Sequence, residues 1–240
     1  MPAEISIIVP VFDEADNVLP LAREVARALD KEPRTFELLF VDDASRDGTW
    51  ERIEEARRID PRVRGVRHAR NSGQSAALWT GIQSGTGGII ATLDGDLQND
   101  PADLPRLFAE LESVDFVCGW RVNRRDNWLR RISSGIARRA RKIVLGADFR
   151  DTGCALRAFR RAALDGVFPF NGWHRFLPIL VQDHGTAIKE IPVHHRPRAA
   201  GVSKYGVWNR LGRGIYDLIG VRWYRKRRLR SVPIIGLGEQ

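Results

Sequence analysis

The chain has 240 residues, of which 43% are hydrophobic, so it can bury a sizeable core and intrinsic disorder is excluded. Its two cysteines, Cys118 and Cys154, form no CxxC pair, which argues against a zinc site or a disulfide framework and favours a reducing compartment. The apolar start at residues 5–11 is too short for a signal peptide, and no apolar run approaches the roughly 18 residues of a membrane span, so we expect neither.

The net charge of +9 hides an asymmetry between the two halves of the chain. Residues 1–120 carry 13 Lys and Arg against 22 Asp and Glu, a net charge of −9, whereas residues 121–240 carry 26 against 8, or +18. An acidic half can hold a metal cation. A basic half is typical of proteins that contact phosphate, either in nucleic acid or in membrane lipid.

Five apolar segments of strand type occur in the first half of the chain, with helix-compatible segments between them. The predicted strands are residues 5–10, 36–41, 63–66, 89–93 and 114–118. Asp16 or Asn17 is expected to cap the first helix and Asp47 the second, a third helix is expected near residues 75–84, and Asp100 with Pro101 opens a fourth. This alternation predicts an α/β fold with a Rossmann-like, mainly parallel sheet flanked by helices.

The second half changes character after Arg121. Residues 126–144 are helix-compatible and rich in arginine, residues 155–159 and 187–193 are strand-like, and residues 194–204 form a basic loop. From residue 207 onward, apolar residues mark one face of a helix that runs into six cations between Arg222 and Arg230. We therefore expect C-terminal amphipathic helices after the sheet.

The predicted strand ends are polar and rich in acids. They are residues 10–14, 42–43, 71–74, 94–96 and 119–121. In parallel α/β sheets ligands bind at the carboxyl ends of the strands, so these residues are expected to meet at one functional edge.

Asp94 and Asp96 flank a single glycine directly after a buried strand. Two carboxylates this close repel each other unless a cation or a donor-rich ligand lies between them. Hard cations such as Mg²⁺ and Mn²⁺ prefer oxygen ligands, and Mg²⁺ commonly shares one or two carboxylates with substrate phosphates. Gln98 adds a neutral oxygen ligand, so the run predicts a divalent cation beside a diphosphate.

Other polar residues have either a ligand-binding or a plainer interpretation. Asp42, at the tip of the second strand, can accept a hydrogen bond from a nucleobase imide N–H or a ribose hydroxyl. For Asp47 we favour helix capping. The histidines show no metal-ligand spacing, and His194 and His195 would face opposite sides of a strand, so we assign them structural or surface roles.

Four motifs in this order and spacing resemble inverting family-two glycosyltransferases with the GT-A fold. They are residues 7–14, 41–49, 71–74 and 93–98. Within that family the chain resembles polyprenyl-phosphate glycosyltransferases of the dolichol-phosphate mannose synthase type. Residues 151–161, 190–196 and 201–205 are similar to the bacterial undecaprenyl-phosphate aminoarabinose transferase branch. The resemblance covers about residues 4–225, with Trp120 in a position where family members often carry serine.

The resemblance implies roles for the matching residues. The nucleotide-sugar donor, with a uridine or a guanosine base, would be bound by Pro10, Phe12, Glu14, Asp42, Gln74 and Asp94. Asp96 and Gln98 would ligate Mg²⁺ or Mn²⁺, and Asp94, Asp96 and Arg121 would form the catalytic set. The acceptor phosphate would be bound by Arg121, Arg130, Ser134, Arg198, Ser203 and Lys204, with Arg131 an alternative to Arg130.

The acceptor chemistry can be argued independently of the family. A phosphate monoester has a second pKa of about 6, so at pH 7 its oxygen needs no strong base to remove a proton. It needs charge compensation instead, because it must approach an anionic donor, and arginine clamps on the acceptor phosphate supply it. A single in-line displacement would invert the anomeric centre.

A lipid-linked acceptor brings the enzyme to a bilayer. The cations near residues 222–230 and the nearby Trp208, Trp223 and Tyr224 fit an interfacial helix on anionic lipid. We expect a catalytic domain over residues 1–202 and a basic, amphipathic membrane-surface extension over residues 203–240. The protein is expected to be peripheral, at the cytoplasmic face, with an apolar tail at residues 232–237 that touches lipid or an integral-membrane partner.

Three alternatives differ from this interpretation in class or in acceptor. Transfer to a saccharide hydroxyl would need a carboxylate base, for which Asp151 is the remaining candidate. A nucleic-acid-binding protein would explain the basic half and the pI near 10.3, but not the acidic strand ends. A dinucleotide-dependent oxidoreductase is disfavoured because the glycine run at residues 85–88 precedes a strand instead of following one.

Overall fold

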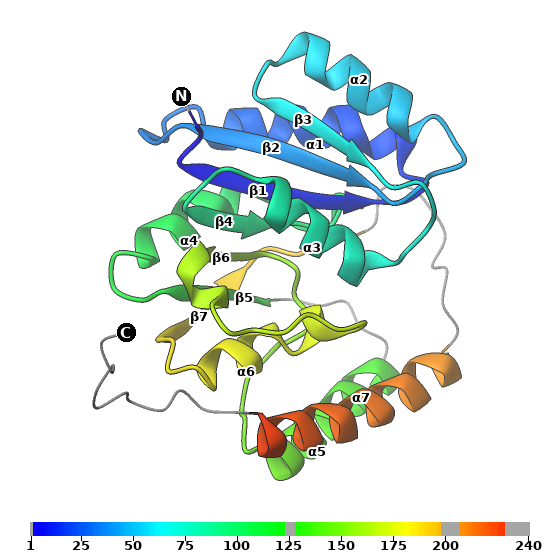
Figure 1. The fold of residues 1–240 in the computed structure, drawn as a ribbon, viewed down its shortest axis with the longest axis vertical. Helices are drawn as coiled ribbons and strands as arrows, with labels where there is room; N and C mark the ends of the chain where they lie inside the picture. The colour runs from blue at the N-terminus through cyan, green and yellow to red at the C-terminus, as the bar shows by residue number, and fades with distance from the viewer. Residues whose placement is uncertain (1, 123–127, 198–206, 229–240) are drawn as a thin grey trace, which may run out of the picture.

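The computed structural model describes residues 2–122, 128–197 and 207–228, and within two helices it leaves out the side chains of residues 128–134, 136–137 and 207–213. Seven strands form one sheet in the order β3-β2-β1-β4-β6-β5-β7 (Figure 1). The strands are β1 (Ile5–Val11), β2 (Phe36–Asp42), β3 (Val63–Arg67), β4 (Ile89–Thr92), β5 (Phe116–Arg121), β6 (Arg157–Arg160) and β7 (Ile188–Val193). The expected α/β fold with a mainly parallel sheet is confirmed.

Helices cover both faces of the sheet. They are α1 (Ala15–Ala28), α2 (Thr49–Ile59), α3 (Gln74–Ser84), α4 (Leu104–Glu110), α5 (Trp128–Leu145), α6 (Leu177–Gln182) and α7 (Val207–Arg227). The helices α1, α2 and α4 pack on the face that receives Ile5, Ile7 and Val9 of β1, whereas α3, α6 and α7 pack on the face that receives Ile8. Because β1 is buried on both faces, its continuous apolar run is what a central parallel strand requires.

The strand β6 departs from simple alternation. It lies between β4 and β5 and runs antiparallel to both, while β4 and β5 run parallel to each other. Its apolar sequence predicts a strand but contains no information on direction. The fifth strand also extends further than expected, to Arg121, which places this arginine at the carboxyl end of β5.

The predicted helix starts are only partly confirmed. Asp100 is the N-cap residue of the short 3-10 turn that leads into α4, and its carboxylate accepts the Ala102 N–H at 3.0 Å, as expected. Helix α1 begins at Ala15 with Glu14 in the N-cap position, so the prediction that Asp16 or Asn17 caps it is wrong. Gly48, not Asp47, is the N-cap residue of α2, although the Asp47 carboxylate accepts the Thr49 N–H at 3.0 Å. The reason is that the two loops before these helices bond to each other, and those bonds set where each helix starts.

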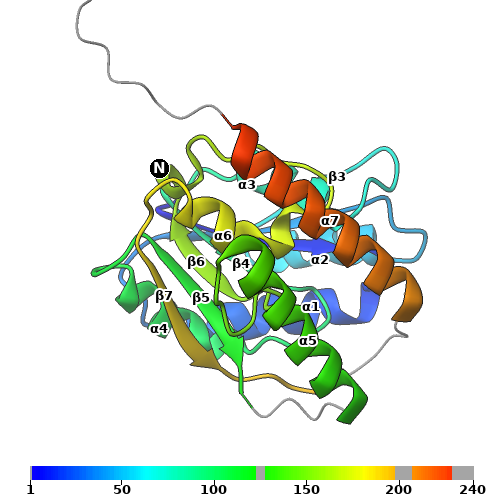
Figure 2. The same cartoon turned by 90° about the horizontal axis from the view of Figure 1, so that it is seen from below.

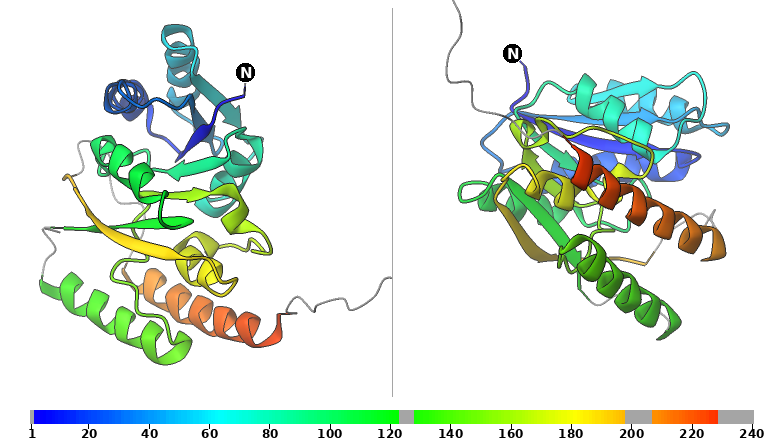
Figure 3. Two further views of the ribbon diagram at one scale, coloured as in Figure 1. Left: turned by 90° about the vertical axis from the view of Figure 1, so that its left-hand side faces the viewer. Right: turned by 60° about the horizontal axis from the view of Figure 1, so that its bottom comes forward.

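The helices α5 and α7 lie side by side at the margin of the molecule (Figures 2 and 3). Val221 of α7 is buried, and Leu218 and Tyr224 pack against the same apolar cluster. The opposite side of α7 exposes large apolar side chains, among them Ile219 and Trp223. Within the described residues, no helix combines the length and the apolar character needed to cross a membrane.

Both cysteines are free and buried. Burial raises the pKa of the Cys154 thiol to about 11 and raises that of Cys118 further. Neither is therefore a ready nucleophile.

Candidate active site

The loops that follow β1, β2 and β4 meet at the edge toward which the arrowheads of β1 to β4 point (Figure 1). Each of these loops contains a residue other than glycine in the left-handed region: Asp13 at φ 51°, Ala44 at φ 59° and Leu97 at φ 60°. Such conformations cost on the order of 1–3 kcal/mol each and persist only where surrounding bonds impose them. Their presence in all three loops marks this edge as the candidate site.

Hydrogen bonds join the loop after β1 to the loop after β2. The Asp13 N–H donates to Ser45 Oγ at 2.9 Å, the Arg46 N–H donates to Asp13 Oδ1 at 2.8 Å, and the Glu14 N–H donates to Thr49 Oγ1 at 2.9 Å. These bonds explain the strained backbone at Asp13. They also fix the two loops relative to each other, as a preformed wall of a ligand site requires.

Asp42 is completely buried at the end of β2. Its Oδ1 accepts the Ser45 N–H at 2.9 Å. Its Oδ2 lies 3.1 Å from Arg67 Nε but receives no hydrogen bond from any residue in the described part of the chain. A buried carboxylate oxygen with spare acceptor capacity suits a ligand N–H or hydroxyl, as the sequence predicts for Asp42.

The neighbouring Asp43 has a role that sequence reasoning missed. Its carboxylate accepts the N–H groups of Ser72 at 2.8 Å and Gly73 at 2.7 Å, and its Oδ1 lies 2.7 Å from His68 Nδ1. Asp43 therefore holds the loop before α3, where Gly73 adopts φ 87°. This loop delivers Gln74 to the first turn of α3.

The acidic run begins beside Gln74. Gln74 Nε2 donates to Asp94 Oδ1 at 2.9 Å, which joins two of the residues predicted to bind the donor. Gly95 lies so close to β1 that a Cβ there would fall 2.7 Å from Val11 Cγ1, so any larger residue would push the run away from the sheet. Glycine between the two aspartates is thus a packing requirement.

Asp96 and Gln98, the predicted metal ligands, are adjacent. Asp96 is 8% exposed, and its Oδ1 accepts the Gln98 N–H at 3.2 Å. Gln98 Nε2 donates to the Arg196 carbonyl at 3.4 Å, which leaves the Gln98 amide oxygen as the ligand atom. No group of three His, Cys, Asp or Glu residues among those described could hold a metal ion. One carboxylate and one amide oxygen fit a cation that takes its other ligands from a substrate diphosphate, as Mg²⁺ commonly does.

Arg121 forms a bidentate ion pair with Asp151. Arg121 Nε lies 2.7 Å from Asp151 Oδ2, and Arg121 Nη2 lies 2.9 Å from Asp151 Oδ1. The two side chains are only 16% and 14% exposed. Burial alone would lower the pKa of Arg121, but the hydrogen bonds to Asp151 and the negative charge of Asp151 raise that pKa above the ordinary value. Arg121 is thus a cation that Asp151 holds in a fixed position.

This pairing bears on the alternative in which Asp151 acts as a base. A carboxylate whose two oxygens both accept hydrogen bonds from an arginine is poorly placed to take a proton from an acceptor hydroxyl. Gly153 packs closely against this ion pair, because a Cβ at that position would lie 3.3 Å from Arg121 Nη2. The geometry favours an anionic acceptor over a hydroxyl that must lose a proton.

A buried arginine supports the Asp151 loop from behind. Arg157 is 3% exposed and donates to the carbonyls of Thr152 at 2.8 Å and His174 at 2.7 Å. His174 Nδ1 in turn lies 2.8 Å from Ser75 Oγ at the start of α3, and burial lowers the pKa of His174 to about 3. The only signal in the sequence was a charged residue inside the apolar strand segment at residues 155–159.

Arg196 ties the start of the basic loop to the acidic run. Its N–H donates to the Gln98 carbonyl at 2.9 Å, and its guanidinium pairs with Asp100 and Glu24 at 2.7 Å each. Of the predicted acceptor residues, Arg198, Ser203 and Lys204 lie outside the described residues. The backbone of Arg130 and Ser134 lies in α5, but their side chains also fall outside the description.

Pro10, Phe12 and Glu14 are half-buried at the end of β1. Phe12 and Glu14 follow the last residue of β1 and lie in the loop that is hydrogen-bonded to Ser45 and Thr49. His194 is held by Asp103, whose Oδ2 accepts the His194 N–H at 2.7 Å, in agreement with a structural role.

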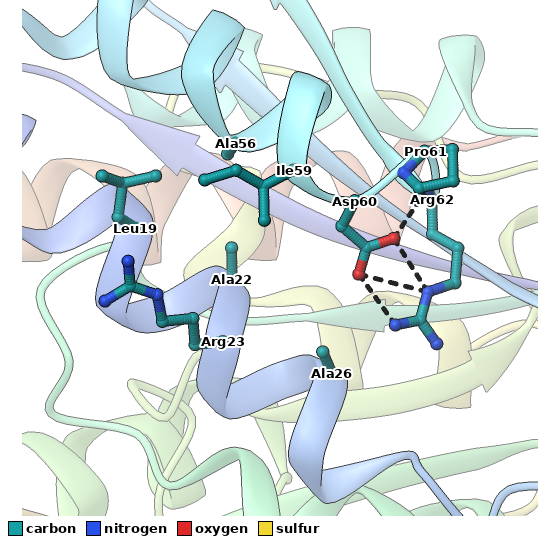
Figure 4. A pocket seen from close by; sticks show the side chains of 9 residues that line it. All are labelled: Leu19, Ala22, Arg23, Ala26, Ala56, Ile59, Asp60, Pro61 and Arg62. Carbon is teal, nitrogen blue, oxygen red and sulfur yellow. Dashed lines mark hydrogen bonds and ion pairs between the residues drawn. The ribbon is translucent and has the colours of Figure 1, made fainter.

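An apolar groove of about 410 Å³ lies elsewhere, between α1 and α2 (Figure 4). Leu19, Ala22 and Ile59 line it, and the ion pair between Asp60 and Arg62 borders it. Because Ile59 to Arg62 lead into the amino end of β3, the groove lies at the edge opposite the site. The groove contains none of the residues predicted to bind the donor, the metal or the acceptor.

Comparison with known proteins decides the family. Residues 6–168 match the family described as Glycosyl transferase family 2. The chain belongs to this family. It is 39% identical to dodecaprenyl-phosphate galacturonate synthase of Rhizobium johnstonii, over 97% of this chain and 70% of that protein. It is 34% identical to undecaprenyl-phosphate 4-deoxy-4-formamido-L-arabinose transferase of Aeromonas hydrophila, over 98% of this chain and 73% of that protein.

Solved structures agree on the fold of this glycosyl transferase. Glucosyl-3-phosphoglycerate synthase from Mycobacterium tuberculosis, in complex with Mn²⁺, UDP and phosphoglyceric acid, superposes with a TM-score of 0.71. The match has 20% identity and covers 95% of this chain and 80% of the other. A complex of that enzyme with Mn²⁺ and UDP-glucose gives the same TM-score at 19% identity, over 93% and 79% of the two chains. The expected GT-A fold is confirmed.

Proposed function

We propose that this glycosyl transferase moves a sugar from a nucleoside-diphosphate donor to a polyprenyl phosphate, with inversion at the anomeric carbon. Both curated relatives described above are polyprenyl-phosphate sugar transferases by name. The observation that carries the proposal is the Arg121–Asp151 pair at the strand edge that also holds Asp94 and Asp96. One edge then offers an acidic side for the donor complex and a fixed cation for an anionic acceptor.

The donor would lie against the wall formed by the loops after β1 and β2. Asp42 Oδ2, which pairs with Arg67 but receives no hydrogen bond from the described residues, would accept one from the nucleobase or the ribose. Phe12 and Pro10 would pack against the base. Glu14 would line the same pocket. Gln74 and Asp94, which are bonded to each other, would contact the sugar and diphosphate. Uridine and guanosine both offer an imide N–H, so Asp42 serves either base.

Asp96 and the amide oxygen of Gln98 would hold the divalent cation, Mg²⁺ or Mn²⁺. When bound, this ion supplies positive charge to the departing nucleoside diphosphate. The chain itself orients both ligands, because the Gln98 N–H is bonded to Asp96 and the Gln98 amide is bonded to the Arg196 carbonyl.

Arg121 would bind the acceptor phosphate, with Arg130 or Arg131, Ser134, Arg198, Ser203 and Lys204 as further contacts. A phosphate monoester is largely ionised at pH 7, so attack needs positioning and charge compensation and no base. The acceptor oxygen would attack the anomeric carbon as the bond from that carbon to the donor diphosphate breaks, and the electron pair leaves with the diphosphate. One such displacement inverts the centre.

We also propose that the enzyme binds peripherally to an anionic bilayer at the cytoplasmic face, where a lipid acceptor is reached. The basic α7 exposes Ile215, Tyr216, Ile219 and Trp223 on one side, which supports this placement. A division into a catalytic domain over residues 1–202 and a membrane-surface extension over residues 203–240 stays a prediction, as does an integral-membrane partner.

A donor screen tests the proposal. The enzyme is mixed with radiolabelled UDP- and GDP-sugars, a short polyprenyl phosphate, a membrane mimic and Mg²⁺ or Mn²⁺. We expect label from one donor to enter the organic extract and to require the divalent cation. The free polyprenol without phosphate is the control acceptor. Equal labelling of the alcohol, or transfer to a saccharide alone, would refute the proposed acceptor.

A further inference from the structure

A basic pocket lies where the C-terminal ends of α5, α6 and α7 meet. Its volume is about 280 Å³, and apolar residues at the end of α5 form one wall. The charged residues that line it are Asp183, Arg222, Arg225, Lys226 and Arg228. Four cations against one carboxylate leave a formal charge of +3, concentrated in a concave surface where the field on an anion is strongest.

Two of these arginines are fixed in place. Arg225 forms a bidentate pair with Asp183, at 2.5 Å from Nε and 2.6 Å from Nη2, and also donates to the Leu145 carbonyl. Arg228 donates to the Asp183 carbonyl. Because both guanidinium groups are already ordered, an anion that enters the pocket does not have to immobilise them.

The other two cations are available for a ligand. Arg222 and Lys226 are exposed, and no hydrogen bond or ion pair holds either of them within the described residues. They lie four residues apart on α7, so their side chains project from the same face. A group with several acceptor oxygens could be bound by both at once.

The face that carries these two cations is otherwise apolar. Successive helix residues differ by 100°, so Ile215, Ile219, Arg222 and Lys226 all fall within about 60° around α7. Ile215 is 53% exposed and Ile219 is 62% exposed, and Trp223 beside them is 64% exposed. At a bilayer surface the headgroup phosphates lie above the hydrocarbon. The apolar stripe would therefore contact the hydrocarbon while the basic pocket contacts the phosphates.

We propose that this pocket binds the phosphate of an anionic phospholipid headgroup. The pocket has room for one headgroup. The apolar stripe beside it favours a lipid over a nucleic acid, because a nucleic-acid backbone offers no hydrocarbon for these side chains to contact. The site is separate from the catalytic edge, because its lining residues come from the C-terminal ends of α5, α6 and α7 and include none of the residues at the carboxyl ends of the strands. A second phosphate contact outside the catalytic edge restricts how that edge is oriented on the membrane. The inference rests on the proposed function only in taking the bilayer as the source of the phosphate.

Vesicle binding of two matched double variants tests the pocket. The first removes Arg222 and Lys226 by Arg222→Gln and Lys226→Gln. The second removes two exposed cations of the same helical layer that do not line the pocket, by Arg139→Gln and Arg227→Gln. Binding is measured by co-sedimentation with phosphatidylcholine vesicles that contain one part in five of phosphatidylglycerol.

If the cations acted only by diffuse attraction to the vesicle, removal of each charge would weaken binding about fivefold, and both double variants would be weakened equally. Direct contact adds the loss of charge-assisted hydrogen bonds, so we expect the pocket variant to bind about tenfold more weakly than the control variant. Equal weakening would overturn the proposal.

Two further arms separate the phosphate source and the enzymatic function. Titration with inorganic phosphate in the absence of vesicles tests whether the pocket binds a soluble ligand. The lipid assignment would be overturned if the pocket variant lost phosphate binding while both double variants bound vesicles equally. In detergent with a short polyprenyl phosphate, both double variants should turn over like the wild type. If the proposed function is wrong, the wild-type enzyme will transfer no sugar in this assay, whereas the difference in vesicle binding between the two double variants will persist.

Discussion

The Arg121–Asp151 ion pair allows the structural and the functional roles of Arg121 to be measured separately. In the variant Arg121→Gln, Asp151, which is 14% exposed in the wild-type structure, loses two charge-assisted hydrogen bonds of 2.7 and 2.9 Å. Removal of one partner of a buried pair costs about 3–5 kcal/mol, and the residual exposure of this pair lowers our expectation to about 2–4 kcal/mol of unfolding free energy. The double variant Arg121→Gln with Asp151→Asn replaces the ions by two neutral amides. It should recover most of this loss.

Acceptor binding should not recover in the double variant. If Arg121 contacts the acceptor phosphate, loss of a charge-assisted contact worth about 2–3 kcal/mol raises the KM for polyprenyl phosphate roughly 30- to 150-fold, while the KM for the donor changes little. The measurements are denaturant unfolding and steady-state kinetics with each substrate varied. A double variant whose acceptor KM returns to the wild-type value would refute a direct role, because Arg121 would then act only by holding the Asp151 loop.

Three further substitutions test the donor side and the support behind it. Asp96→Asn keeps the Gln98 N–H contact, so transfer should fall at least about hundredfold with an unchanged melting temperature, and wild-type turnover would exclude Asp96 as a metal ligand. Asp42→Asn should weaken nucleotide binding about 10- to 100-fold in a calorimetric titration, and an unaltered affinity for both UDP and GDP would remove Asp42 from the base pocket. The pKa of His174 is lowered to about 3, so its contribution to stability is complete above pH 6.5 and is lost as the pH falls toward 3, by up to about 1.4 kcal/mol per unit. Unfolding followed from pH 7 to pH 4 should therefore show a shallower decline for His174→Asn than for the wild type, and parallel curves would contradict the burial of a neutral His174.

Much of the candidate donor side could be predicted from the sequence because its signals are local. Each apolar run is a strand, and the acidic residues that follow it must lie at the carboxyl end of that strand. Asp42, Asp94 and Asp96 were found in this way, and the parallel direction of the strands brings their ends to one edge.

Residues that act across the sheet were harder to predict. Asp43 is adjacent to Asp42 in the chain, yet it holds the backbone of Ser72 and Gly73, and nothing in its local pattern distinguishes the two aspartates. Arg157 binds carbonyls of two loops, an arrangement that exists only once those loops are packed. The predicted caps of α1 and α2 failed for a related reason, since bonds between two loops outweigh the preference of a single residue.

The sequence by itself determined the strands, the acidic edge and the family, because apolar runs, turn residues and short motifs act over a few neighbouring positions. Only the tertiary structure decided that β6 enters the sheet antiparallel between β4 and β5, and that Arg121 pairs with Asp151, 30 positions further along the chain. The physical reason is that sheet order and long-range ion pairs depend on which segments the packed core brings together. No local spacing in the sequence encodes that outcome. The packed core is what places the Arg121 cation at the same edge as the acidic residues.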